Sequence, residues 1–257
     1  MEYNRVIVFC DYGLDDAVAT LHILRNTDMF EHIDIVPIGG NMPVDIAYRN
    51  AHTLLAAAGA DTKKVRIVDT RGISQPAENI PDIHGDDGMG GILAPRKSAA
   101  EVISFDEFKA ELSRLHDLEN DCVLSLGPCT VPVLLGYYPD MTVAMGGTTS
   151  EPPNYGDYEF NEGLDRAAFK TFAENAVAVA TLDSCHDKAF GFETLKFGDE
   201  LTDRLMEKYL TLCESRNAPV AVYDYVAALY VTNPELFELH RVYRSDGVGY
   251  NEIKYNA

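Results

Sequence analysis

Three aspartates lie close together in the stretch VIVFCDYGLDDAVATLHIL, residues 6–24. Asp11 follows an apolar, β-branched run, and Asp15 and Asp16 open an apolar helical pattern. A strand-to-helix turn at Gly13, which can adopt a positive φ, would let the three carboxylates converge. Carboxylates so close raise one another's pKa unless a cation or a helix N-terminus compensates them. Oxygen ligands of this kind favour a hard cation, Ca²⁺ or Mg²⁺, over zinc.

The same spacing also fits a purely structural role, in which Asp15 or Asp16 caps the helix and Asp11 ends the strand. The local pattern leaves both interpretations open. Other polar side chains lie after predicted strands or before a predicted helix, namely Asn41, His84 (in a glycine-rich loop), Glu159, Asn161 and Asp224. Each one alone is typical of a turn or a helix cap, but together they support a shared site.

The elements that would position these residues alternate along the chain. Short β-branched runs lie at 5–9, 33–40, 63–70, 121–127, 141–147 and 176–183, and helical patterns at 16–26, 43–59, 130–138 and 165–176. This alternation predicts an α/β fold with an open, mostly parallel sheet flanked by helices, because the strands are apolar throughout. Ligands of such sheets bind at the carboxyl ends of the strands. Segments 71–100 and 146–160 are expected to be loops near that edge.

The composition narrows the class of protein. With 257 residues, of which 46% are hydrophobic, we expect a single α/β domain over 1–257. The formal net charge of −20 argues against binding to nucleic acid or to an anionic membrane. No signal-like start or membrane-length apolar run is present, so we expect a cytoplasmic protein. The five scattered cysteines lack zinc-site spacing, which predicts reduced packing residues.

Taken in order along the chain, several motifs resemble those of the inosine-uridine-preferring nucleoside hydrolases. FCDYGLDD is similar to the family's Asp-x-Asp-Pro-Gly-x-Asp-Asp hallmark, and the later motifs include GGN, HGDDGMGG, LGPCT, MGG, EFN, LDSCH and YDYVAALYVTNPELF. The resemblance implies an open α/β sheet and a glycosidase that hydrolyses a ribonucleoside or related N-riboside to ribose and free base. It also implies a role in ribonucleoside catabolism and base salvage. Family members are often dimers or tetramers.

The resemblance further implies a metal site and a general base. Asp11, Asp16, Asp224 and the backbone carbonyl of Leu126 would hold one Ca²⁺, with Mg²⁺ less favoured. In that scheme the ion also holds the ribose 2′- and 3′-hydroxyls and the attacking water, and Asp11 takes the proton of that water. Hydrolysis passes through an oxocarbenium-like sugar, so a positioned water is needed on one face and a neutralised leaving base on the other.

Substrate contacts are implied in the same way. Asp15 and Asn41 would bind ribose hydroxyls or orient the water, and Glu159 and Asn161 would bind the 5′-hydroxyl end of the sugar. On the base side, the substrate contacts are expected from His84 and Tyr223. Further candidates there, each of which also fits a packing or solvated role, are His186, Tyr155, Tyr158, Tyr209 and Arg216.

The chain departs from the family pattern in several places. Phe9 stands for the first aspartate of the hallmark and Tyr12 for its proline, while Tyr223 replaces the histidine proposed as leaving-group acid. Phe9 should affect the surroundings of the metal more than the metal itself. Tyr223 is a weak acid, because tyrosine has a usual pKa of about 10. The region between His186 and Tyr223 and the segment after PELF are both shorter than is usual in the family.

Two other functions fit parts of this pattern. A Ca²⁺-dependent ribose- or nucleoside-binding protein would keep the metal site without turnover. A Mg²⁺ phosphoryl-transfer enzyme would use Asp11 as a nucleophile. The second is disfavoured, because no aspartate lies two places after Asp11 and no Gly-Thr follows.

Overall fold

The computed structural model describes residues 3–115, 117–191 and 197–256. Its strands are β1 (Tyr3–Cys10), β2 (Phe30–Pro37), β3 (Val65–Asp69), β4 (Glu101–Ser104), β5 (Asp121–Ser125), β6 (Met141–Met145), β7 (Ala178–Ala180), β8 (Phe237–Tyr243) and β9 (Gly249–Tyr255). They form one sheet in the order β4-β3-β2-β1-β5-β6-β7-β9-β8. β8 pairs antiparallel with β9, and the other neighbouring pairs are parallel, which confirms the predicted α/β class.

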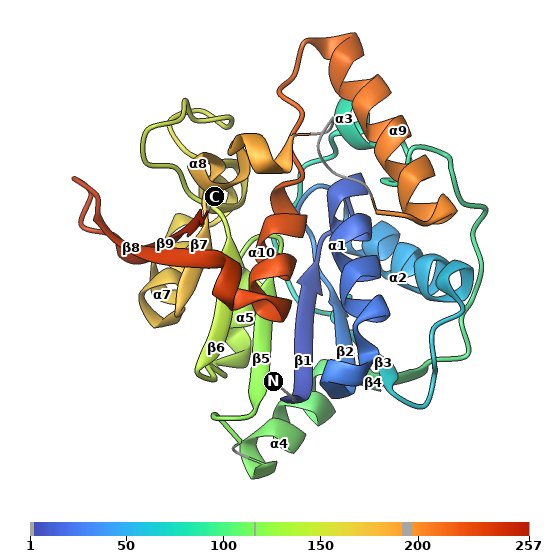
Figure 1. Cartoon of the computed structure of the whole chain (residues 1–257). Helices are drawn as coiled ribbons and strands as arrows, with labels where there is room; N and C mark the ends of the chain where they lie inside the picture. The colour runs from blue at the N-terminus through green and yellow to red at the C-terminus, as the bar shows by residue number, and fades with distance from the viewer. Residues whose placement is uncertain (1–2, 116, 192–196, 257) are drawn as a thin grey trace.

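The helices cover both faces of this sheet (Figure 1). They are α1 (Leu14–Arg25), α2 (Val44–Ala58), α3 (Pro81–His84), α4 (Phe105–Leu115), α5 (Thr130–Leu135), α6 (Phe160–Leu164), α7 (Arg166–Asn175), α8 (Leu182–Cys185), α9 (Glu200–Arg216) and α10 (Tyr223–Thr232). Three short 3₁₀ turns lie at Thr27–Met29, Lys188–Phe190 and Pro234–Leu236.

Two apolar cores explain why the strands read as continuous apolar runs. Side chains alternate across a strand, so Val6 and Val8 of β1 pack with α1, α2, α9 and α10, whereas Ile7 and Phe9 pack with α4, α5 and α7. Phe9, which replaces a carboxylate of the family hallmark, is fully buried in the second core. Phe9 therefore packs within the core and does not face the site.

The chain changes direction across the sheet next to β1. It runs outward from β1 through β2 and β3 to β4, and then returns to place β5 on the other side of β1. Phe9 pairs with Val36 of β2 and with Ser125 of β5, so the three strands end at one level. The loops after them separate at this point, which is where open α/β sheets form a ligand crevice.

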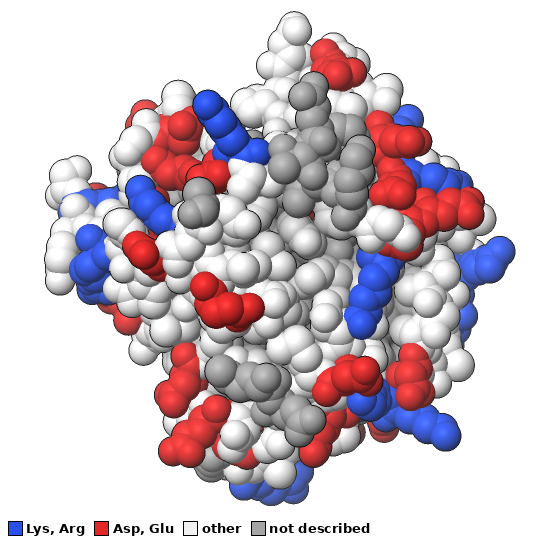
Figure 2. All heavy atoms as spheres, in the orientation of Figure 1, with Lys and Arg blue, Asp and Glu red and all other residues white. Residues whose placement is uncertain are grey.

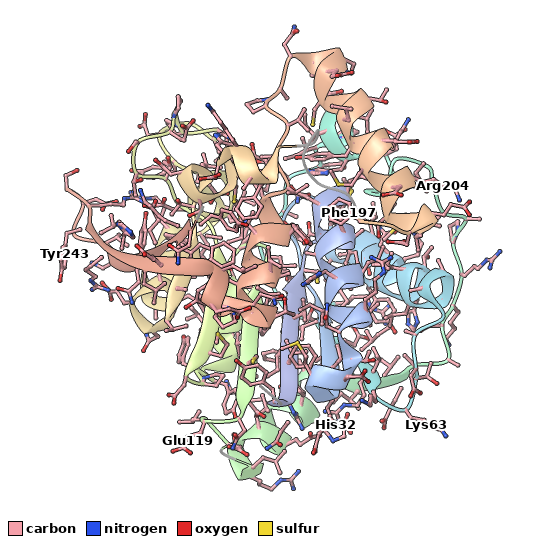
Figure 3. All side chains as sticks on the ribbon, in the orientation of Figure 1. His32, Lys63, Glu119, Phe197, Arg204 and Tyr243 are labelled. Atoms are coloured by element: carbon pink, nitrogen blue, oxygen red, sulfur yellow. The ribbon has the colours of Figure 1, made fainter. Side chains whose placement is uncertain are left out.

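The predicted elements are present, with shifted ends and several additions. The helix expected at 16–26 begins at Leu14, and segment 71–100 contains the short helix α3. Sequence reasoning did not predict β4, α4, α6, α8, α9 or the β8–β9 hairpin. β8 is an edge strand with mostly exposed side chains, and its last residue, Tyr243, projects from the molecule with 78% of its surface exposed (Figure 3). Edge strands of this kind carry polar residues and lack a continuous apolar run.

The surface and the cysteines agree with the composition. On the face drawn in Figure 2, acidic and basic side chains are interspersed, and the basic ones form separate small groups. Each of the five cysteines is buried and free of disulfides, as predicted. Among the described residues, we find no helix of the length and apolar character that a membrane span requires.

Candidate active site

A pocket of about 330 Å³ opens at the carboxyl ends of the strands. This volume is within the range of small-molecule sites, about 300 to 1,000 Å³. Most of the predicted site residues line it: Asp15, Asn41, His84, Leu126, Glu159, Asn161, Tyr223 and Asp224. Asp11 and Asp16 are fully buried close to this wall, and their contacts link them to the residues that line it.

Four buried aspartates form what we call the carboxylate cluster: Asp11, Asp15, Asp16 and Asp224. One oxygen from each of Asp15, Asp16 and Asp224 lies within 4.8 Å of the other two. Burial raises the pKa of Asp11 to about 6 and that of Asp15 to about 7. For Asp224, burial and the charges of the other three carboxylates raise the pKa well above its usual value. The cluster therefore concentrates negative charge that a bound cation could balance.

The turn before α1 differs from the predicted one. Tyr12 has the positive φ, 55°, whereas Gly13 has φ −75°. Gly13 is needed for close approach instead, because a Cβ atom there would lie 2.7 Å from Cε1 of His84. A left-handed φ is unusual for a tyrosine and is often found next to functional sites.

The helix-cap interpretation holds in part for Asp16. Its Oδ2 accepts the Gly13 N–H at 2.9 Å and its Oδ1 accepts the Asp11 N–H at 3.2 Å. Backbone N–H groups of Asp15 and Asp16 also lower the pKa of the Asp15 carboxyl, yet its buried Oδ1 has no hydrogen-bond partner. Asp224 is the second residue of α10, whose N-cap is Val222, so it is not a cap. Capping therefore explains Asp16 and Asp15 in part, and leaves Asp224 and Oδ1 of Asp15 unexplained.

The loops after β2 and β5 surround Asp11, and the first of them donates hydrogen bonds to it. Its Oδ2 accepts the backbone N–H of Asn41 at 2.7 Å, and its Oδ1 accepts Nδ2 of Asn41 at 3.1 Å. A Cβ atom at Gly40 would collide with Oδ2 of Asp11, and one at Gly127 would lie 2.9 Å from its Cγ. The glycines after β2 and β5 thus make room for this carboxylate.

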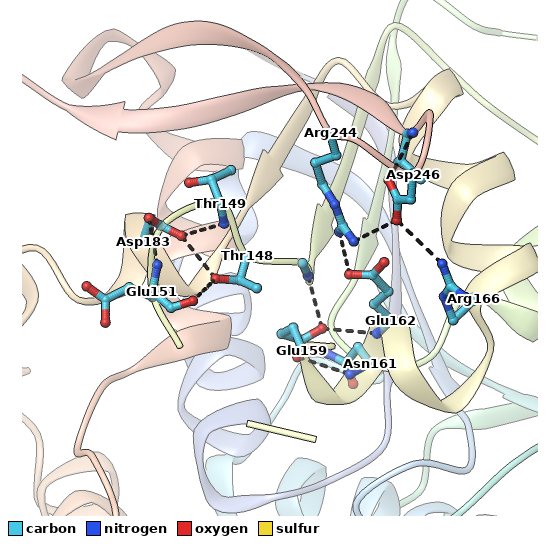
Figure 4. Close-up of polar contacts among 12 residues, drawn as sticks. Thr148, Thr149, Glu151, Glu159, Asn161, Glu162, Arg166, Asp183, Arg244 and Asp246 are labelled. Atoms are coloured by element: carbon cyan, nitrogen blue, oxygen red, sulfur yellow. Dashed lines mark hydrogen bonds and ion pairs between the residues drawn. The ribbon is translucent and has the colours of Figure 1, made fainter. Parts of the chain in front are cut away.

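Glu159 and Asn161 are held by the start of α6 (Figure 4). Glu159 is the N-cap, and it accepts the backbone N–H groups of Gly147, Asn161 and Glu162, each at 3.0 Å. Burial nevertheless raises the pKa of Glu159 to about 7. Asn161 donates from Nδ2 to the Leu126 carbonyl at 2.9 Å, while its buried Oδ1 has no partner. That oxygen can accept a hydrogen bond from a ligand hydroxyl.

The β8–β9 hairpin braces this part of the pocket. Arg244 donates to Glu162 at 2.6 Å and to Asp246 at 2.8 Å, and Arg166 of α7 lies 3.4 Å from the same Asp246 (Figure 4). These ion pairs connect the hairpin to α6 and α7. A segment that the sequence pattern did not predict therefore supports the helix that carries Asn161.

His84 ends α3 and does not lie in a glycine-rich loop as predicted. Its Nδ1 accepts the Leu14 N–H at 3.1 Å, and burial lowers its pKa to about 3. The ring is therefore neutral with its proton on Nε2, so the 3.9 Å separation from Asp15 is not an ion pair. The ring stacks on Tyr209 with 5.9 Å between centroids. His84 and Tyr209 form part of the pocket wall.

The other base-side candidates divide into two groups. His186 and Tyr209 line the pocket, although Tyr209 lies within α9 and not in a loop. The remaining candidates have partners elsewhere: Tyr155 donates to Glu78, Tyr158 lies under the Arg166 guanidinium and Arg216 pairs with Asp82.

Sequence reasoning missed the apolar part of the wall, which consists of Ile80, Ile83, Met145, Pro152, Phe160, Leu182, Cys213, Ala218 and Pro219. Most of these residues lie in loops or in helices outside the recognised motifs. Asn154 also lines the pocket.

The chain is similar to known proteins over most of its length. The family model described as inosine-uridine preferring nucleoside hydrolase matches residues 6–249. The inosine-uridine preferring nucleoside hydrolase of Crithidia fasciculata is 28% identical over 93% of this chain and 82% of its own length.

Solved structures show the same fold. A purine-preferring ribonucleoside hydrolase from Gardnerella vaginalis superposes with a TM-score of 0.75 at 20% identity, over 98% of this chain and 88% of that one. An inosine-guanosine nucleoside hydrolase gives a TM-score of 0.74 at 18% identity, over 99% and 89% of the two chains. Because the family model covers nearly the whole sequence, this chain belongs to the inosine-uridine preferring nucleoside hydrolase family.

Proposed function

We propose that this protein hydrolyses the N-glycosidic bond of a ribonucleoside or a related N-riboside, and that a divalent cation, Ca²⁺ in preference to Mg²⁺, assists the reaction. The observation that carries the proposal is the carboxylate cluster beside a pocket of about 330 Å³. Family membership supports a glycosidase with a small nucleoside substrate.

The donor set fits a hard cation. We propose Asp11, Asp16, Asp224 and the Leu126 carbonyl as ligands, and the geometry adds Asp15, whose carboxylate lies within 4.8 Å of two of them. All of these donors are oxygens, as Ca²⁺ prefers, and Oδ1 of Asp15 is buried without a partner. The carbonyl of Leu126 keeps one lone pair free beside its bond from Asn161. When bound, the cation would lower the pKa of water and favour hydroxyl ligands.

Asp11 is the proposed general base. Asn41 holds both of its oxygens, so the carboxylate has one orientation relative to the pocket. Each carboxylate oxygen has further lone pairs for a water molecule. As the water attacks C1′ of the sugar, Asp11 takes its proton, and the surrounding carboxylates favour the positive charge that develops on the sugar ring.

Two buried oxygens in the pocket wall can accept hydrogen bonds from sugar hydroxyls, and the one on Asp15 is also a candidate cation donor. Oδ1 of Asp15 and Oδ1 of Asn161 are buried and have no hydrogen-bond partner. Both residues line the pocket, as does Glu159. We assign Asp15 and Asn41 to the ribose hydroxyls and Asn161 and Glu159 to the 5′ end. His84 and Tyr223 border the space left for the base.

A panel of ribosides, incubated with the protein and Ca²⁺ and assayed for reducing sugar, tests the proposal. We expect release from at least one purine or pyrimidine ribonucleoside, and release slower by a factor of about 10² to 10⁴ from the Asp11→Asn variant. Asp106→Asn, an exposed change on α4, is the matched control and should keep full activity. Tight riboside binding without sugar release would instead identify a binding protein.

A further inference from the structure

A second polar chain borders the pocket at Tyr223. The Tyr223 hydroxyl lies 3.1 Å from Nε2 of His186, and Nδ1 of His186 lies 3.0 Å from Oε2 of Glu151. Tyr223 and His186 both line the pocket, and Glu151 precedes the lining residue Pro152. Three separate segments thus meet in one hydrogen-bonded chain: the start of α10, the residue after α8 and the loop after β6.

The loop that carries Glu151 is fixed by α8 (Figure 4). Asp183 accepts the backbone N–H groups of Thr149 and Ser150, each at 2.8 Å, and that of Glu151 at 3.2 Å. Thr148 donates its hydroxyl to the Glu151 carbonyl at 2.7 Å. Asp183 precedes His186 by three residues, so one short helix positions both the histidine and the loop that carries its carboxylate partner.

The chemistry of these groups sets the direction of the chain. A carboxylate only accepts hydrogen bonds, so Nδ1 of His186 donates to Glu151. When Nε2 also carries a proton, it donates to the Tyr223 oxygen, and the proton of the Tyr223 hydroxyl is then free to point into the pocket. When Nε2 has lost its proton, it accepts from that hydroxyl instead. The hydrogen-bonded row of side chains therefore has two forms, one with a proton on Nε2 of His186 and one without it.

We propose that Glu151, His186 and Tyr223 form a proton relay that protonates the departing base, with the Tyr223 hydroxyl in contact with it. This proposal rests on the proposed function. In this relay Tyr223 stands where the family has a histidine, and His186 returns a proton to Tyr223.

The C1′–N bond breaks, its electron pair stays on the base, and an oxygen–carbon bond forms between water and C1′. The base takes the hydroxyl proton of Tyr223, and the tyrosine oxygen takes the proton from Nε2 of His186, so the tyrosine remains neutral. The imidazole becomes neutral and keeps Nδ1–H on Glu151. After release, the proton that Asp11 took from water passes to solvent, and solvent returns one to Nε2.

Two substrates separate the relay from the rest of the site. A ribonucleoside needs a proton on its leaving base, whereas a 4-nitrophenyl riboside leaves as a stable phenolate and needs none. We expect Tyr223→Phe and His186→Gln to lower kcat for the nucleoside by about a hundredfold or more, with little change for the aryl riboside. Glu151→Gln should give a smaller loss with the same selectivity. Tyr230→Phe, at the far end of α10, is the matched control.

The outcomes distinguish the two proposals. An equal loss on both substrates, in variants whose thermal unfolding matches the parent protein, would overturn the relay and leave Tyr223 and His186 as groups that shape the pocket. Unchanged nucleoside turnover in Tyr223→Phe would also overturn it. Failure of the parent protein to cleave either substrate would instead overturn the proposed function itself.

Discussion

Two of the places where this molecule buries carboxylates differ in what balances their charge. Asp34 of β2 is fully buried, but Arg5 lies 3.3 Å and Arg66 2.8 Å from its oxygens, and Arg66 also binds Glu111 of α4 at 2.9 Å. We call these four residues the arginine-paired cluster. In the carboxylate cluster, by contrast, the charges acting on Asp224 are those of other aspartates.

The difference separates a structural role from a functional one. A buried charge loses its hydration, and a nearby opposite charge is the usual compensation. The arginine-paired cluster has that compensation within the fold. The carboxylate cluster has the same burial without it, an arrangement that destabilises the protein and is typical of ligand sites. Matched substitutions in the two clusters therefore test which one depends on something outside the chain.

The largest expected effect is on turnover. Asp11→Asn keeps the shape of the side chain but cannot take the proton of water, so we expect kcat to fall by about 10² to 10⁴. Asp34→Asn should leave kcat per folded molecule nearly unchanged, because Asp34 lies under α4 and outside the pocket. Steady-state kinetics with a nucleoside substrate measures both. Equal losses in the two variants would contradict the division of roles.

The next effect is on stability, and here the substitution in the arginine-paired cluster should cause the larger loss. Asp34→Asn removes the charge that pairs with the buried Arg5 and the half-buried Arg66, and we expect it to lower the free energy of unfolding by about 3 to 5 kcal/mol. Asp15→Asn, measured in chelator, removes one of several repelling carboxylates and should leave that free energy unchanged or higher. Urea unfolding followed by circular dichroism gives both values. A large loss in the Asp15 variant would show that this cluster is a structural one.

Cation binding should sharpen the same contrast. A ligand that binds only the folded state stabilises it by about 2.7 kcal/mol when its concentration is a hundredfold above Kd. We expect Ca²⁺ to raise Tm by this mechanism, and Mg²⁺ to do so less. The Asp224→Asn variant should lose the response, whereas Asp34→Asn should retain it from a lower starting Tm. A Tm that is indifferent to Ca²⁺ and to chelator would count against the metal site.

The two clusters also show how far sequence reasoning reaches. The strands β1 to β3 and β5 to β7 followed from apolar runs, and the polar residues that end the first two followed from the positions of Asp11 and Asn41 along the chain. Since parallel strands end at one edge, their convergence needed no knowledge of tertiary contacts. The family resemblance extended this to Asp224, which lies more than two hundred residues from Asp11.

Other parts depended on contacts that no local pattern encodes. The sequence does not show that Tyr12, and not Gly13, takes the positive φ, nor that Gly13 packs closely against His84 from a distant segment. The proposed role of Glu151 depends on Asp183 of α8, which accepts a hydrogen bond from the loop that carries Glu151. β8 and β9 pair with each other, β9 also pairs with β7, and single side chains such as Tyr250 and Ile253 are buried in the cores without forming an apolar run.

The smallest effect that we predict is a pair of opposite pH dependences in the metal-free protein. The pKa of Glu111 is lowered to about 2, chiefly by hydrogen bonds from Arg66. A lowered pKa gives stability that is present above the usual pKa and lost as the pH falls toward 2. Because this ion pair is partly exposed, we expect about 1 kcal/mol from it.

The pKa of Asp15 is raised to about 7, first by burial and then by the charge of Asp11. Its contribution is therefore present below pH 4 and lost as the pH rises through 7. Unfolding curves from pH 3 to 8 in chelator should show a loss at both ends. Glu111→Gln should flatten the acid side, and Asp15→Asn should reduce the neutral loss, to which Asp11 and Glu159 also contribute. Ca²⁺ should abolish the loss of stability near pH 7 and leave the loss at acid pH. That result would show that the cation balances the charge of the carboxylate cluster, as Arg5 and Arg66 balance the charge of the arginine-paired cluster.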